Sequence, residues 1–169
     1  MTPVCLLVLG FATLPLLAAE GTAKSPTDAT RIQGAWKIVS GEEEGKAQDV
    51  PPGLSWTFQG NTLIVRIDGK LAGAATFKLK EAGPAKHMDL TAIPPDPRMG
   101  PELRPGAEIE KSPVFAIYKL SGDTLTICAA KPGKPRPTAF ATRKGDPCAL
   151  VLLRRMPAED SRPGRQPKP

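Results

Sequence analysis

Only one histidine is present, and its neighbours decide whether it could support catalysis. His87 and Asp89 are separated by one residue, so on a β-strand both side chains would lie on the same face. An aligned carboxylate and imidazole could perform general acid–base chemistry, but that chemistry also requires a pocket for the substrate. No serine or cysteine stands out as an activated nucleophile. We therefore interpret His87 and Asp89 as a polar pair on a strand surface, and we expect a protein that is not an enzyme.

Metal and cofactor chemistry has equally little support. Glu42, Glu43 and Glu44 are consecutive carboxylates, but Gly41 and Gly45 flank them, which is typical of a solvated turn. The sequence lacks a second histidine for a metal triad, and it lacks a Cys-x-x-Cys motif. Glycines occur singly within predicted turns, without the clustering of a phosphate-binding loop. The sequence therefore predicts neither a metal nor an organic cofactor.

Two of the three cysteines lie in the part of the chain that should fold. Cys128 ends one predicted strand and Cys148 begins a later one, so the two side chains could lie close together. Alternation along the strand places Cys128 inside the fold or at its rim, where a thiol packs as a small apolar group. A Cys128–Cys148 disulfide and two separate buried thiols both remain open.

A proline-rich loop follows Cys128 and concentrates positive charge. Lys131, Lys134 and Arg136 alternate with prolines, which would hold the loop stiffly at one rim of the fold. This cationic rim could bind an acidic partner, or the prolines could simply keep the rim ordered. The formal net charge of +6 is modest, and much of it lies in the C-terminal tail. Aromatic residues are too few and too apolar in their setting to form a stacking platform for nucleic acid.

The first residues have the composition of a secretory signal. Residues 4–17 are almost wholly apolar, which matches a signal-peptide core and is short for a membrane-spanning helix. Small residues at Ala18 and Ala19 then provide a cleavage site. We expect residues 1–19 to be a signal peptide, with a short membrane anchor as the alternative, and residues 20–30 to be a linker. The mature protein would be exported, to the periplasm or outside the cell, without stable insertion in a membrane.

The rest of the chain has the pattern of many short β-strands. Residues 54–58 alternate large apolar and small polar side chains, which is the period of a half-buried strand. Comparable strands are expected at residues 35–40, 63–67, 75–80, 86–91, 114–120, 124–129, 138–142 and 149–155. Eight or nine strands with mostly tight turns predict an all-β, antiparallel up-and-down meander over residues 31–156. Closure into a barrel would remove its exposed edges, and a sandwich is the alternative.

A helical turn, a long loop and a tail complete the predicted organisation. A short N-terminal helical turn would begin at Thr27 or Asp28, either of which can cap it. Residues 93–113 hold six prolines, a density that a central strand cannot accommodate, so this stretch should be a surface loop. Residues 157–169 should be a disordered, basic, proline-rich tail.

The same alternation predicts what fills the barrel. Trp56, Phe58, Phe77 and Tyr118 would point inward with other aromatic side chains. Small barrels are often packed solid, whereas barrels of about eight strands can also enclose one ligand. We favour a filled or nearly filled interior because large apolar side chains are frequent at the inward positions. If the barrel is hollow, these four residues would contact a small apolar ligand.

Seven segments, taken in order, carry a resemblance to a known family. They are IQGAWKIVSGE (32–42), LSWTF (54–58), ATFKL (75–79), MDLT (88–91), AIYKL (116–120), GDTLTIC (122–128) and RPTAF (136–140). The order closely resembles an uncharacterised domain family of planctomycetes, which occurs there in many paralogous copies, often behind signal peptides. The resemblance covers roughly residues 31–155, and the stretch 93–113 is longer than the family's pattern. It implies a fold and an exported location, and no established activity.

That family is itself similar to lipocalin-like barrels. Gly34-x-Trp36 after a short helical turn looks like the lipocalin Gly-x-Trp signature. In that fold a late arginine packs over the tryptophan and helps to close one end of the barrel. The resemblance therefore implies barrel closure by Trp36 and Arg154, with Arg155 also at a suitable place.

Two classes of function are compatible with these features. The first is a non-catalytic binding module, for a small apolar ligand in the barrel or an acidic partner on the rim at Lys131, Lys134 and Arg136. The alternative is a structural or interaction component of the cell envelope, with a filled barrel and no ligand.

Overall fold

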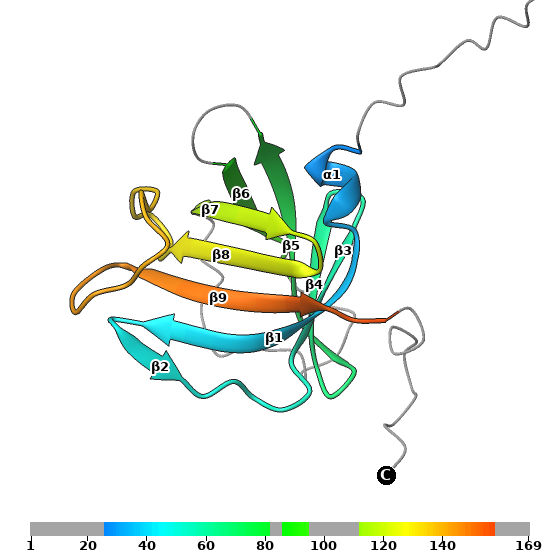
Figure 1. The fold of residues 1–169 in the computed structure, drawn as a ribbon, viewed down its shortest axis with the longest axis horizontal. Coiled ribbons are helices and arrows are strands. Elements are labelled where there is room, and N and C mark those ends of the chain that lie inside the picture. The colour runs from blue at the N-terminus through cyan, green and yellow to red at the C-terminus, as the bar shows by residue number, and fades with distance from the viewer. Residues whose placement is uncertain (1–25, 82–85, 95–111, 158–169) are drawn as a thin grey trace, which may run out of the picture.

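The computed structural model of the chain describes residues 26–81, 86–94 and 112–157 (Figure 1). The predicted signal peptide, most of the linker, most of the loop 93–113 and the tail beyond residue 157 lie outside the described residues. Within the described residues, no helix has the length and apolar character needed to cross a membrane.

The described chain folds into one short helix and nine strands, which lie in a single sheet. Their bounds are α1 Asp28–Arg31, β1 Gly34–Glu43, β2 Lys46–Gln48, β3 Ser55–Gln59, β4 Thr62–Ile67, β5 Lys70–Lys80, β6 Lys86–Ala92, β7 Val114–Ser121, β8 Thr124–Ala130 and β9 Cys148–Arg155. Neighbouring strands follow the order β2-β1-β3-β4-β5-β6-β7-β8-β9, and β1 also pairs with β9. All pairs are antiparallel, so eight strands close into a barrel and β2 is an extra strand. The predicted antiparallel barrel is confirmed.

Closure depends on β1, which has two neighbours along one edge. Its first residues, from Gly34 to Lys37, pair with β3, and its last residues pair with β2. Its other edge pairs with β9 from Trp36 to Glu43, with a register shift between Ile38 and Ser40. An extra residue in one strand bends it and increases its twist. This irregularity lets one strand bridge the first and last strands of the meander.

The inward side chains of the strands form one apolar core. Leu125 and Ile127 alternate with outward residues on β8 and are fully buried. The rings of Phe58 and Phe77 meet edge to face, with their centroids 5.2 Å apart, which is a favoured aromatic geometry. The core residues are Ile32, Trp36, Ile38, Phe58, Leu63, Phe77, Met88, Ala116, Tyr118, Leu120, Leu125, Ile127 and Leu153.

Helix α1 lies at one end of the barrel (Figure 1). Thr27 occupies the N-cap position, as predicted, but its side chain makes no capping bond. Asp28 is instead buried, with its carboxylate 2.5 Å from Lys86 Nζ and 3.1 Å from Arg31 Nη1. The pair with Lys86 attaches the helix to β6, whereas the pair with Arg31 lies within the helix. Together they neutralise a carboxylate that would otherwise be costly to bury.

The connection from β8 to β9 differs from its prediction. Residues 138–142 were expected to form a strand, but residues 131–147 contain no strand and form one long loop. Its prolines cannot donate ladder hydrogen bonds, and Gly133 and Gly145 adopt positive φ angles of 71° and 87°. We call this loop the strap. It lies at the end of the barrel opposite α1, beside the β1–β2 hairpin (Figure 1).

Candidate functional site

One end of the barrel is closed by Trp36 and Arg155. The Arg155 guanidinium carbon lies 4.2 Å from the centroid of the Trp36 ring, and its Nη1 donates to the Gln33 carbonyl at 2.7 Å. A second donor of the same group reaches the Arg31 carbonyl. The assignment of Arg154 to this role was wrong: alternation along β9 turns Arg154 to the outside, where it is exposed. Trp36 is placed as expected, with its indole nitrogen 2.8 Å from the Ile32 carbonyl.

The four aromatic residues expected inside the barrel do face the core. Phe58, Phe77 and Tyr118 are buried, while Trp56 is half-buried and packs against the same cluster. The Tyr118 hydroxyl is fully enclosed and makes no hydrogen bond of normal geometry to a described residue. Burial raises the pKa of Tyr118, and the nearby Asp28 carboxylate raises it further. The four aromatic residues act as packing within the core, and Tyr118 adds one polar atom beneath α1.

His87 and Asp89 lie side by side on the outer face of β6, as the alternation predicted. Asp89 is ion-paired with Arg136 of the strap. The same guanidinium donates to the carbonyl oxygens of Ala116 and Met88, the latter at 3.2 Å. Asp89 therefore serves to hold the strap, and the structure contains no His87–Asp89 hydrogen bond.

Arg136 is the main attachment of the strap to the barrel wall. Its guanidinium carbon lies 5.1 Å from the centroid of the Phe115 ring, in addition to its contacts with β6 and β7. Charge-assisted bonds of this kind are stronger than neutral ones. Arg136 is therefore fully engaged within the protein, and little of its charge is left for a partner.

Residues near both ends of the strap are attached to the β1–β2 hairpin. The Thr142 hydroxyl donates to Glu42 Oε1 at 2.5 Å and accepts from the Gly45 amide at 2.9 Å. Lys131 Nζ lies 2.7 Å from Glu43 Oε1, and this carboxylate raises the pKa of Lys131. The glutamates expected in a solvated turn thus include two that anchor the strap.

Both cysteines point to the outside of the barrel and are buried by the strap. Cys128, which was expected inside the fold or at its rim, alternates with the inward Ile127 and instead packs in a second cluster with Ile117, Cys148 and Leu150. Both cysteines are free thiols. Burial raises the pKa of Cys128 to about 12, and the adjacent Cys148 thiol contributes.

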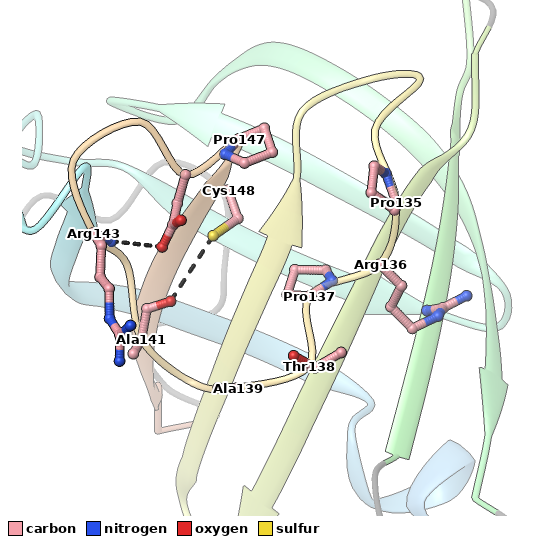
Figure 2. Close-up of a pocket in the computed structure, with 10 residues that line it drawn as sticks. Pro135, Arg136, Pro137, Thr138, Ala139, Ala141, Arg143, Pro147 and Cys148 are labelled. Carbon is pink, nitrogen blue, oxygen red and sulfur yellow. Dashed lines mark hydrogen bonds between the residues drawn. The ribbon is translucent and has the colours of Figure 1, made fainter.

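A pocket of about 380 Å³ lies along the strap (Figure 2). Figure 2 shows Arg136 directed toward the barrel wall, while Cys148 faces the Ala141 carbonyl, 3.9 Å from its sulfur. The Arg143 amide donates to the Asp146 carboxylate at 2.8 Å and so closes the turn before β9. The lining residues are Pro135, Arg136, Pro137, Thr138, Ala139, Ala141, Arg143, Asp146, Pro147 and Cys148.

The exposed cations of the strap are not the three residues that the sequence predicted. Of the residues Lys131, Lys134 and Arg136, the first and third are ion-paired. Lys134, Arg143 and Lys144 are exposed and form no ion pair with any described residue. Sequence reasoning missed Arg143 and Lys144 because it ended the rim at the expected strand 138–142.

Comparisons with protein-family models, with curated proteins and with solved structures found no match to this chain. Among the residues that the structure describes, no three His, Cys, Asp or Glu side chains converge as metal ligands.

Proposed function

We propose that this protein is a non-catalytic binding module that presents the strap to an acidic partner. The observation that carries the proposal is that three cations on one anchored loop are exposed and form no ion pair with a described residue: Lys134, Arg143 and Lys144. Asp146 is the only acidic residue in the strap, so the surface has a clear positive excess. A patch of one sign attracts a partner of the opposite sign and accelerates its association.

Anchoring the strap strengthens this proposal. Arg136 and Thr142 hold it at two separated points, on the β6–β7 wall and on the β1–β2 hairpin. Three prolines within residues 132–137 restrict the backbone further. A preorganised loop loses less conformational entropy when it binds than a flexible one does. The cations are therefore displayed in a defined arrangement.

A small apolar ligand inside the barrel has less support. Phe58 and Phe77 contact each other, and Trp36 is covered by Arg155 and bonded to the backbone. These side chains occupy interior space that a ligand would need. The second candidate function, a structural component of the cell envelope with a filled barrel, is favoured by the same packing.

The export and family proposals rest on the sequence. We propose that residues 1–19 direct export and that the chain is a member of the planctomycetal, lipocalin-like domain family. The order of the motifs supports the family, and the arginine over Trp36 supports the likeness to lipocalins. N-terminal sequencing of the protein secreted from its host would test the cleavage site directly.

Binding to a fluorescein-labelled oligoglutamate peptide tests the proposed function. The triple variant Lys134→Gln, Arg143→Gln, Lys144→Gln should bind about fivefold to tenfold more weakly at low salt, since three exposed contacts of about 0.3–0.5 kcal/mol each are lost. The control triple variant Lys37→Gln, Lys70→Gln, Lys119→Gln removes the same charge from exposed positions on β1, β5 and β7.

The measured quantity is fluorescence anisotropy at about 20 mM and 500 mM salt, because surface attraction is screened at high salt. Equal affinity of the two triple variants would overturn the strap as the binding surface. No binding by the wild-type protein would favour the structural role. An apolar molecule that copurifies with the protein in native mass spectrometry would move the binding site to the barrel interior.

A further inference from the structure

Two thiols lie together beneath the strap, and neither takes part in closing the barrel. In the register of β8 with β9, Cys128 is opposite Leu150 and Cys148 is opposite Ala130. The cysteines are therefore diagonal neighbours on the outer face of adjacent antiparallel strands. Both side chains belong to one buried cluster with Ile117. The Cys148 thiol also contributes to the raised pKa of Cys128. The two thiols are therefore neighbours beneath the strap.

The pocket gives the two thiols unequal access to solvent. Cys148 lines the pocket and is 7% exposed, whereas Cys128 is 0% exposed and does not line it. A volume of about 380 Å³ is within the range of pockets that hold small organic molecules. A reagent that enters the pocket can therefore contact Cys148, whereas Cys128 is shielded from it.

We propose that the pocket is a thiol–disulfide exchange site for low-molecular-weight linear disulfides, in which Cys148 is modified first and Cys128 resolves the product. The Cys148 thiolate attacks one sulfur of the disulfide R–S–S–R, whose S–S bond breaks and releases R–S⁻, which takes up a proton. Cys128 then loses its proton to water and attacks the Cys148 sulfur, which releases the second R–SH. Two protein thiols are oxidised to one disulfide, and one small disulfide is reduced to two thiols.

The environment of Cys128 suits the second step and not the first. A thiol with a pKa of about 12 has very little thiolate near pH 8, so it reacts slowly with a reagent from solution. Once Cys148 carries the mixed disulfide, the attack becomes intramolecular, and correct placement raises effective concentration by many orders of magnitude. Burial thus orders the two reactions in time.

The backbone can adjust to the bridge at one end. Diagonal neighbours in an antiparallel pair are about 7–8 Å apart, slightly beyond the usual Cα separation in a disulfide. Cys148 is the first residue of β9 and follows Pro147 of the strap, so it sits at the junction between strand and loop. Formation of the bond requires this junction to move toward Cys128. This exchange chemistry does not depend on an acidic partner.

Intact-mass spectrometry of the folded full-length protein, with Cys5→Ser in every sample, tests the proposal with bis(2-hydroxyethyl) disulfide at pH 8. The expected end product lacks two hydrogens and carries no adduct. Cys128→Ala should stop at one hydroxyethylthio adduct. Cys148→Ala should form an adduct at least about tenfold more slowly than Cys128→Ala, because the remaining thiol is 0% exposed and its burial still raises its pKa.

Three outcomes would overturn the proposal. Cys148→Ala could react as fast as Cys128→Ala, the protein with both thiols could accumulate a stable adduct, or no thiol could react while the protein is folded. Urea unfolding followed by tryptophan fluorescence confirms that each variant is folded before the reaction. Unreacted thiols in a folded protein would count against the pocket, whatever the result with the oligoglutamate peptide.

Discussion

Replacing Arg155 with alanine should strongly destabilise the barrel, whereas replacing its neighbour Arg154 should have little effect. Arg155 donates to the carbonyl oxygens of Arg31 and Gln33 and covers the Trp36 ring at 4.2 Å. Two charge-assisted bonds at a partly exposed site contribute about 1 kcal/mol each, and the cation–π contact about 1 kcal/mol more. Its contact with Asp123, which is 78% exposed, adds little. We expect a loss of about 3 kcal/mol for Arg155→Ala.

Urea unfolding monitored by tryptophan fluorescence measures this loss. With a slope of about 1.5 kcal/mol per molar urea, 3 kcal/mol lowers the midpoint by about 2 M. Arg154→Ala removes the same charge from an exposed position and should stay within about 0.5 kcal/mol of wild type. Arg155→Lys should fall between them, since an ammonium lacks the planar fork and stacks poorly. Equal losses at Arg154 and Arg155, or a loss below 1 kcal/mol at Arg155, would refute the closure by Arg155.

Three further predictions concern a turn, the helix end and the buried thiol. Gly53→Ala should cost at least about 1 kcal/mol more than Gly69→Ala in urea unfolding. Both glycines have positive φ, but only at Gly53 would a Cβ lie 2.0 Å from a carboxylate oxygen and 2.9 Å from the backbone nitrogen of Asp68, in the β4–β5 turn. Asp28→Asn should lower the free energy of unfolding by about 1–2 kcal/mol, because the ion pairs of the buried carboxylate are lost. The loss stays in this range because the lysine partner is 38% exposed and can be hydrated. Unchanged stability would contradict this account. Cys128→Ala should remove a pH dependence of the free energy of unfolding, of up to about 1.4 kcal/mol per pH unit between pH 9 and 12. In this range the unfolded thiol ionises and the folded thiol, with a pKa of about 12, does not, so only the wild type loses this stability as the pH rises. Parallel pH profiles of the two proteins would disprove the raised pKa.

Local patterns were enough to predict the barrel and the faces of most strands. The alternation in residues 54–58 placed Phe58 in the core, and the spacing of His87 and Asp89 placed both on one outer face. These features depend on the two-residue period of a strand, which is local information. The order of hairpins then leaves little choice of topology, since consecutive strands pair with each other.

The strap shows where local patterns fail. Its residues 138–142 have the composition of a strand, but a strand needs a free sheet edge, and β8 already pairs with β9. Whether Cys128 faces in or out depends on one residue of register, and so does the choice between Arg154 and Arg155. A one-residue difference in phase exchanges the two faces, and short apolar runs carry no signal that fixes it.

The amino-acid sequence by itself determined the all-β class, the succession of hairpins and the presence of a stiff, cationic loop between the last two strands. Only the tertiary structure decided which of those cations are ion-paired. Lys131 and Arg136 are held by Glu43 and Asp89, which lie 88 and 47 residues away along the chain (131 − 43 and 136 − 89). Ion pairs across such separations form only when the barrel closes and brings its hairpins together. The same closure lays the strap over Cys128 and Cys148 and makes a pocket beside them.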